Sequence, residues 1–136
     1  MKHTALLPLL FICLAGKAQN KLDNAIIVKT TKNLKEIKQV LFNNGFTIDG
    51  TDTSFFVTTP KQMKTASVVR LMIARNDTSI TIKGQAKIQV EFMGIKNDFE
   101  PVEYRLSKQN LNYEWFGEMN KVAKLLGSEI TYLKQL

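Results

Sequence analysis

The chain has 136 residues, of which 44% are hydrophobic, and its 19 Lys and Arg outnumber 12 Asp and Glu to give a formal net charge of +7. Its only cysteine, Cys13, and its only histidine, His3, both lie near the N-terminus. The residues after Cys13 therefore cannot form a Ser-His-Asp or Cys-His catalytic arrangement, a Cys and His zinc site, or a disulfide among themselves.

The N-terminal segment has the layout of a secretory signal peptide. A basic start at Lys2 and His3 precedes an unbroken apolar run over residues 5–15, and small residues then occupy the last and third-last positions of the segment. The apolar run is far shorter than the roughly 20 residues that a membrane-spanning helix needs. The pattern predicts export to the periplasm or the cell exterior, with cleavage near Ala18 and one mature domain over residues 19–136.

Removal of residues 1–18 would take away two lysines and lower the net charge from +7 to +5. A mildly basic exported chain favours loose attraction to anionic envelope polymers or lipid headgroups, so we expect membrane contact to be peripheral at most. Export also makes nucleic acid an unsuitable partner.

The first elements of the mature chain are a predicted strand and helix. Residues 24–29 are short, apolar and rich in β-branched side chains, which indicates a strand. Asn33 followed by Glu36 is the spacing of a capping box and predicts a helix that begins after Asn33. Apolar residues at helical spacing continue until Gly45, which ends the helix. Residues 46–49 then return to the period of a strand.

Several further strands are predicted in the middle of the chain. Residues 54–59 and 67–75 are interpreted as strands because apolar and β-branched residues dominate them. Alternation of apolar and polar residues extends over 79–92, as one strand or as two. Residues 93–109 are interpreted mostly as a loop, with 102–106 as a possible short strand.

A second helix closes the predicted domain. Asn110 or Asn112 can cap it, and Gly127 ends it. One apolar stripe runs along it at helical spacing: Trp115, Phe116, Met119, Val122, Ala123 and Leu126. Residues 128–133 either form a terminal strand or continue the chain without regular structure. The order β-α-β-β-β(-β)-α predicts an α+β fold in which an antiparallel sheet of four to six strands carries two helices on one face.

The sheet face that the helices leave open is the predicted binding surface. Alternation assigns these residues to the covered face: Ile26, Val28, Phe55, Val57, Val69, Leu71, Ile73, Ile80 and Ile82. It assigns these to the open face: Ile27, Phe56, Thr58, Val68, Arg70, Met72, Ala74, Thr81 and Lys83. An apolar patch rimmed by basic residues often marks a partner site, so we select Phe56, Arg70, Met72 and Lys83 as candidate binding residues. The alternative is a solvated face with scattered apolar residues.

Three lysines suggest a second contact surface. Lys32, Lys35 and Lys38 recur every three residues, so they are expected to share one face of the first helix. They predict contact with an anionic surface, and the alternative is an ordinary solvated helix face.

The chain's carboxylates also occur in close groups: Asp49 with Asp52, Asp98 with Glu100 and Glu103, and Glu114 with Glu118. A carboxylate-based glycoside hydrolase needs two acids across a cleft, one of them with a raised pKa. No glycine-rich phosphate loop accompanies these groups, and a calcium loop starting at Asp49 would place Pro60 where glutamate is required. We therefore expect no catalysis, no cofactor and no metal site, with a hydrolase or lyase that uses Asp or Glu as the alternative.

The segment from Ile26 to Pro60, IIVKTTKNLKEIKQVLFNNGFTIDGTDTSFFVTTP, resembles a known pattern of small exported bacterial domains. In order and spacing it is similar to the βαββββα domains of the C lipoprotein of the outer-membrane β-barrel assembly machine, and to exported domains of unknown function with a TATA-binding-protein-like fold. The resemblance implies a non-catalytic envelope domain and supplies no catalytic residues.

The resemblance and the candidate residues together lead to one functional expectation. We expect the chain to bind an envelope protein, peptide or glycan through its open sheet face or its loops. A carrier of an apolar ligand, held between sheet and helices, is the further alternative to the hydrolase or lyase.

Overall fold

A computed structural model describes residues 22–49, 52–89 and 98–135, so the predicted signal peptide lies outside the described residues. The elements follow one another as β1 (Ala25–Lys29), α2 (Leu34–Asn43), β2 (Ile48–Asp49), β3 (Phe55–Thr58), β4 (Lys61–Gln62), β5 (Ser67–Arg75), β6 (Ser79–Ile88), β7 (Glu100–Pro101), α3 (Leu111–Leu126) and β8 (Glu129–Leu133).

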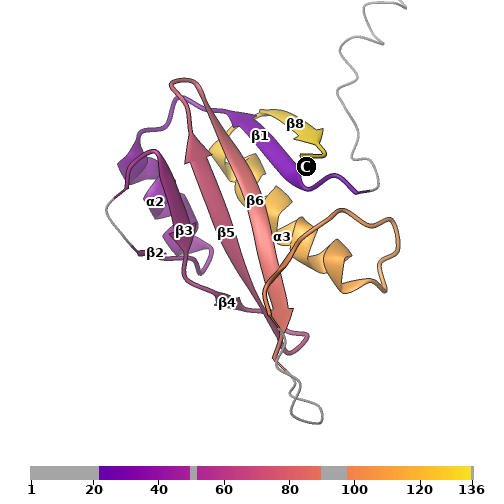
Figure 1. Cartoon of the computed structure of the whole chain (residues 1–136). Helices are drawn as coiled ribbons and strands as arrows, with labels where there is room; N and C mark the ends of the chain where they lie inside the picture. Colours follow the sequence, from indigo (N-terminus) through magenta and orange to yellow (C-terminus); the bar gives the residue numbers. More distant parts are fainter. Residues whose placement is uncertain (1–21, 50–51, 90–97, 136) are drawn as a thin grey trace, which may run out of the picture.

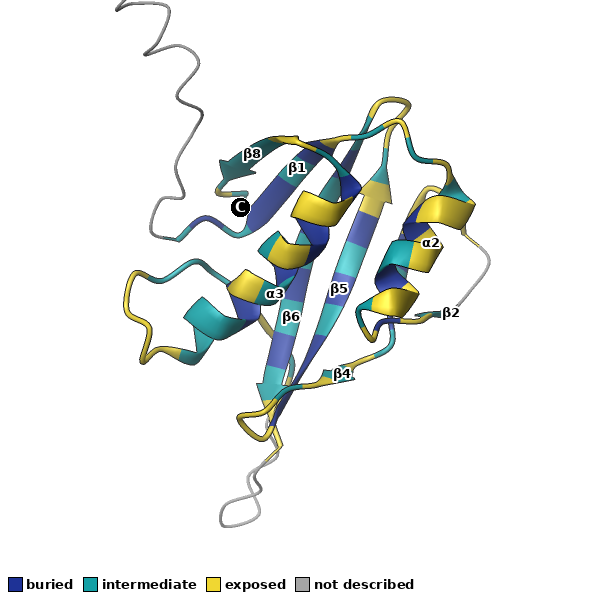
Figure 2. Ribbon diagram, turned by 180° about the vertical axis from the view of Figure 1, so that it is seen from behind, coloured by how far each residue is buried: buried dark blue, intermediate teal, exposed yellow. Residues whose placement is uncertain are grey.

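The strands form one antiparallel sheet with the order β2-β3-β5-β6-β1-β8, while the short β4 pairs with β5 and the short β7 pairs with β6 (Figure 1). Seen from behind, both helices lie on the same face of this sheet (Figure 2). The predicted α+β fold is therefore confirmed. The sheet exceeds the predicted four to six strands because the two-residue strands β4 and β7, which the sequence did not predict, also pair.

The first helix begins and ends where its sequence predicts. The Asn33 side chain accepts the Glu36 backbone N–H at 2.9 Å, and the Glu36 carboxylate accepts the Asn33 backbone N–H at 3.4 Å, which completes the capping box. Past the end of α2, Gly45 has a φ of +86°, in the left-handed region that glycine enters without a steric penalty. Ile37 and Leu41 form the buried side of the helix.

The structure answers four questions that the sequence left open about the later elements. Within the predicted stretch 79–92, Ser79 to Ile88 is one strand, paired with β5 from Ser67 opposite Ile88 to Arg75 opposite Ile80, while residues 90–92 lie outside the described residues. Residues 102–106 are not a strand. Asn110 caps α3, and residues 129–133 add β8 beside β1.

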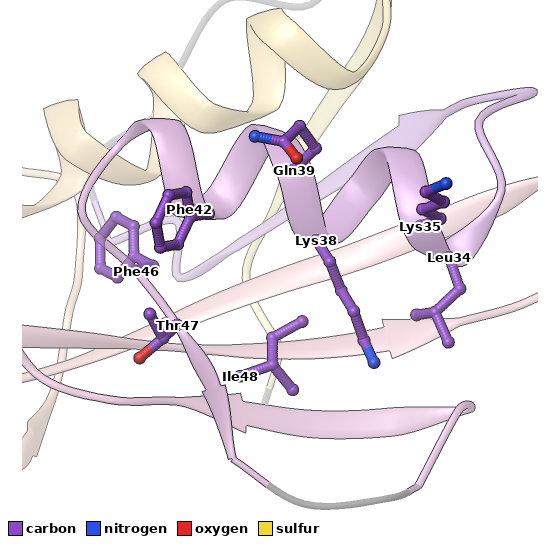
Figure 3. Close-up of a pocket in the computed structure, with 8 residues that line it drawn as sticks. All are labelled: Leu34, Lys35, Lys38, Gln39, Phe42, Phe46, Thr47 and Ile48. Carbon is purple, nitrogen blue, oxygen red and sulfur yellow. The ribbon is translucent and has the colours of Figure 1, made fainter.

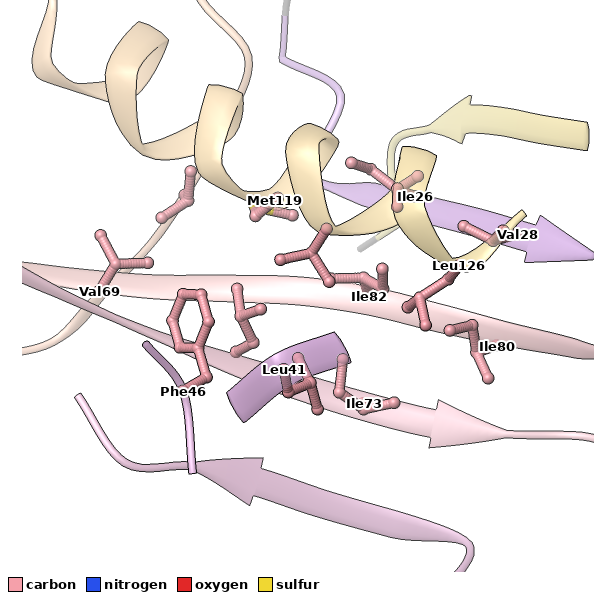
Figure 4. Close-up of a cluster of buried hydrophobic side chains, with 14 of the residues drawn as sticks. Ile26, Val28, Leu41, Phe46, Val69, Ile73, Ile80, Ile82, Met119 and Leu126 are labelled. Atoms are coloured by element: carbon pink, nitrogen blue, oxygen red, sulfur yellow. The ribbon is translucent and has the colours of Figure 1, made fainter. Parts of the chain in front are cut away.

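A single hydrophobic core fills the space between the sheet and the helices (Figure 4). Leu41, Phe46 and Met119 lie fully buried within it. The second helix approaches β6 closely, because a Cβ placed on Gly84 would stand 2.7 Å from the Met119 sulfur. The missing side chain at Gly84 therefore leaves room for the Met119 side chain of α3 against β6.

One buried polar contact joins the second helix to the sheet. The indole N–H of Trp115 donates to the hydroxyl of Ser67 at 3.0 Å, and both residues are buried. A buried N–H without an acceptor is costly, so this contact fixes the orientation of the indole ring.

The phase of β3 is the main correction to the predicted sheet. Phe56 pairs with Ile73 and is only 4% exposed in the core, whereas Phe55 pairs with Ala74 and is 48% exposed. Phe56 and Thr58 therefore face the helices, and the prediction that they lie on the open face was wrong by one residue. Alternation fixes the faces within a strand, but only the pairing with β5 fixes which set faces inward.

Candidate functional site

The open face of the sheet is hollowed where β3, β5 and β6 lie side by side. The strand register aligns Phe55, Ala74 and Thr81 in one row across these strands. The neighbouring row places Met72 beside Lys83. The resulting depression, here called the open-face hollow, has a volume of about 370 Å³ and is lined by Phe55, Met72, Ala74, Thr81, Lys83 and Gln135.

The C-terminal end of the chain supplies one wall of the open-face hollow. The backbone N–H of Gln135 donates to the Asn24 side-chain oxygen at 2.7 Å, and the Asn24 amide donates to the Gln135 carbonyl at 2.7 Å. This reciprocal pair holds the residues that follow β8 beside β1. Sequence reasoning missed both residues, because 111 positions separate them and neither belongs to a local pattern.

The opposite end of the open face is occupied by the chain itself. The ring of Phe99 lies under two cations, with its centroid 3.9 Å from the guanidinium carbon of Arg70 and 4.8 Å from the Lys87 amine nitrogen. Arg70 also donates through Nε to the Gln85 side chain at 2.8 Å. Cation–π contacts of this kind order both partners. Arg70 is therefore engaged by Phe99 and Gln85 within the domain, which the sequence did not predict.

The structure brings together two of the four predicted binding residues. Met72 and Lys83 are direct cross-strand partners and both line the open-face hollow. Phe56 lies in the core. Phe55 occupies the position on the open face that the sequence analysis had assigned to Phe56. The same sequence pattern would have found Phe55 if the phase of β3 had been known.

The three predicted contact lysines do not form one surface. Lys32 precedes the N-cap residue Asn33 and lines a separate hollow with Lys29 and Lys124. Lys35 and Lys38 lie on α2 and line a groove next to β2. The expectation of one helix face was therefore wrong for Lys32, because the helix begins after it.

Two of the candidate acids, Asp52 and Glu118, are engaged in contacts within the domain. Asp52 accepts the Ser54 backbone N–H, the Ser54 hydroxyl and the Phe55 backbone N–H, and these hydrogen bonds, led by the Ser54 backbone, lower the pKa of Asp52. A lowered pKa is the opposite of what a general acid requires. Glu118 forms an ion pair with Lys61. The side chain of Asp49 lies outside the described residues.

Residues 22–49, 52–89 and 98–135 contain no group of three or more His, Cys, Asp or Glu arranged to hold a metal ion. None of the helices in these ranges is both long and apolar enough to span a membrane. Comparison with protein families, curated proteins and solved structures finds no match to this chain.

Proposed function

We propose that the mature chain is an exported, non-catalytic domain of the cell envelope that binds a protein partner at the open-face hollow. The observation that carries this proposal is the half-exposed ring of Phe55, which lies in a row with Ala74 and next to Met72. Aromatic residues and Met are enriched at protein interfaces, and apolar patches on a sheet face often mark them.

The chemistry of the hollow indicates what the partner presents. Core side chains fill the space between the sheet and the helices, so we place the bound group on the surface. Phe55 and Met72 offer contact to an apolar side chain. Lys83, at the same hollow, favours an acidic residue beside that side chain, because complementary charge selects partners and speeds encounter.

Location in the cell envelope rests on the signal-peptide pattern of residues 1–18. It has a direct test in the N-terminal sequence of the protein recovered from the periplasm or the medium. A mature chain that begins at Gln19 supports export, and a cytoplasmic protein that still begins at Met1 contradicts it.

Binding can be tested by site-specific photo-crosslinking in the producing cell. A photoreactive phenylalanine analogue replaces Phe55 in one strain and Leu106 in a control strain. Leu106 is 68% exposed, lies in the segment before α3 and does not line the hollow. We expect position 55 to yield one discrete protein adduct, identified by mass spectrometry, and position 106 to yield none of it.

The identified partner then allows a quantitative test with purified proteins. Removing the Phe55 ring by Phe55→Ser, or reversing the charge by Lys83→Glu, is expected to weaken binding roughly tenfold or more, which corresponds to about 1.4 kcal/mol. Identical adducts from positions 55 and 106, or unchanged affinity of both variants, would contradict binding at this hollow.

A further inference from the structure

A second groove lies on the other side of the sheet, between α2 and the edge strand β2. Its volume is about 590 Å³, and its lining residues are Leu34, Lys35, Lys38, Gln39, Phe42, Phe46, Thr47 and Ile48 (Figure 3). Phe46 is fully buried, whereas Phe42 is 64% exposed. The groove therefore has an apolar floor and an exposed aromatic side chain at its wall.

The groove runs beside a sheet edge with backbone groups turned outward. In the described part of the chain, β2 is the last strand on this side of the sheet and pairs only with β3. The Thr59 backbone N–H donates to the Thr47 carbonyl at 2.8 Å, which makes these two residues a hydrogen-bonded position of the antiparallel ladder. Hydrogen-bonding direction alternates along a strand. The next residue, Ile48, therefore directs its N–H and C=O away from β3, toward the outer edge.

The Ile48 side chain faces the same side of the sheet as α2. Ile48 pairs with Thr58, which is buried under the helices, and Ile48 itself packs against the core. An extended chain laid beside β2 would thus meet the N–H and C=O of Ile48 in its own plane and the apolar side chains of Phe46 and Ile48 beneath it. These are the two elements of recognition by strand addition, in which the main chain gives affinity and pockets for alternate side chains give specificity.

The charge of the groove selects among extended chains. Its two charged lining residues, Lys35 and Lys38, are both cations and both exposed. In Figure 3, Lys38 reaches from α2 toward the side on which Leu34 and Ile48 lie. We propose that this groove binds an extended, acidic segment of a partner polypeptide, which adds a strand to the sheet at β2. This site goes beyond the open-face hollow and uses different residues.

A library of random short peptides displayed on phage can test this binding mode on the purified protein. We expect enriched sequences to alternate apolar and acidic residues and to lack proline at the centre. A synthetic copy of the best sequence is then titrated against the protein. Lys35→Glu combined with Lys38→Glu should weaken its binding roughly tenfold or more. The matched control Lys32→Glu reverses a lysine that does not line the groove and should change nothing.

Strand addition also predicts a pattern along the peptide backbone. N-methylation of one backbone amide should abolish binding when that amide donates to β2, and methylation of the next amide, which points outward, should be tolerated. Equal sensitivity at successive amides, or equal affinity of wild type and the double Lys→Glu variant, would overturn the proposal. Failure to enrich any peptide would also overturn it.

Two controls separate this site from other surfaces. Phe55→Ser should leave the affinity for the short peptide unchanged, so loss of the open-face hollow and loss of the groove are distinguishable. Phosphatidylcholine vesicles with and without phosphatidylglycerol test whether the two lysines meet an anionic membrane instead. Binding to the anionic vesicles that is lost with Lys35→Glu and Lys38→Glu, with no peptide enriched, would refute a polypeptide ligand in favour of a lipid surface.

Discussion

Truncation of two adjacent phenylalanines tests which face of β3 is buried. Phe56 is 4% exposed and packs in the core, so Phe56→Ala should lower the free energy of unfolding by about 3–5 kcal/mol. Phe55 is 48% exposed. Because complete burial of a Phe side chain contributes about 1.5–3 kcal/mol, Phe55→Ala should cost only about 1 kcal/mol. The predicted difference is a large part of the roughly 5–15 kcal/mol that stabilises a typical domain.

Urea unfolding followed by tryptophan fluorescence measures both variants. Trp115 is the chain's only tryptophan and is buried, so its emission reports on the loss of the core. The two unfolding midpoints are comparable when the slopes agree. In a thermal scan, about 4 °C per kcal/mol places Phe56→Ala roughly 12–20 °C below wild type. Equal losses for the two variants, or a larger loss for Phe55→Ala, would refute the inward orientation of Phe56 and with it the open-face hollow.

Four other substitutions test separate parts of the structure. Gly84→Ala adds a Cβ 2.7 Å from the Met119 sulfur of α3 and should lower the free energy of unfolding by about 1–3 kcal/mol. Gly117→Ala adds a Cβ with nothing within 4 Å and should stabilise the helix by about 0.5–1 kcal/mol. Urea midpoints in the reverse order would contradict the close approach of α3 to β6. Ser67→Ala leaves the Trp115 indole N–H without its acceptor and should cost about 1–3 kcal/mol, and an unchanged midpoint would show that the contact does not stabilise the fold. The pKa of Asp52 is lowered in the folded state, so the stabilisation from its charge is present above the unfolded-state pKa of about 3.9 and is lost as pH falls through the folded-state pKa. Asp52→Asn keeps an oxygen acceptor but removes this pH dependence. The stability difference between wild type and Asp52→Asn should therefore be constant near neutral pH and shrink in acid, and a difference that grows in acid would have the wrong sign.

Features with a local physical cause were predictable from the sequence. The capping box of Asn33 and Glu36 sets the start of α2, and Gly45 sets its end, because both act through residues within one turn. The bounds of β5, Ser67–Arg75, match the predicted strand, since its apolar run is flanked by turn residues. The layer arrangement follows from these elements, because each has one apolar side to bury.

Features that depend on distant residues were not predictable. The inward orientation of Phe56 is set by its pairing with Ile73, which lies on another strand. Arg70 was selected as a binding residue because no local sequence pattern predicts its contact with Phe99, whose ring lies against the Arg70 guanidinium. Met72 and Lys83 were found because both belong to long strands whose alternation is unbroken.

The two proposed surfaces lie on opposite faces of the sheet but near the same edge, formed by β2 and β3, and this has a testable consequence. Strand β3 carries Phe55 on the open face and pairs through its backbone with β2, beside which Lys38 lines the groove. Side chains of a strand added to β2 would alternate between the two faces, so a partner entering the groove would continue across the edge toward Phe55. We therefore expect Lys38→Glu and Phe55→Ser each to weaken capture of the same whole partner. Their effects should add to within about 0.5 kcal/mol, because the two side chains line separate depressions. If Lys38→Glu leaves the crosslink from position 55 unchanged, the groove and the open-face hollow serve different partners.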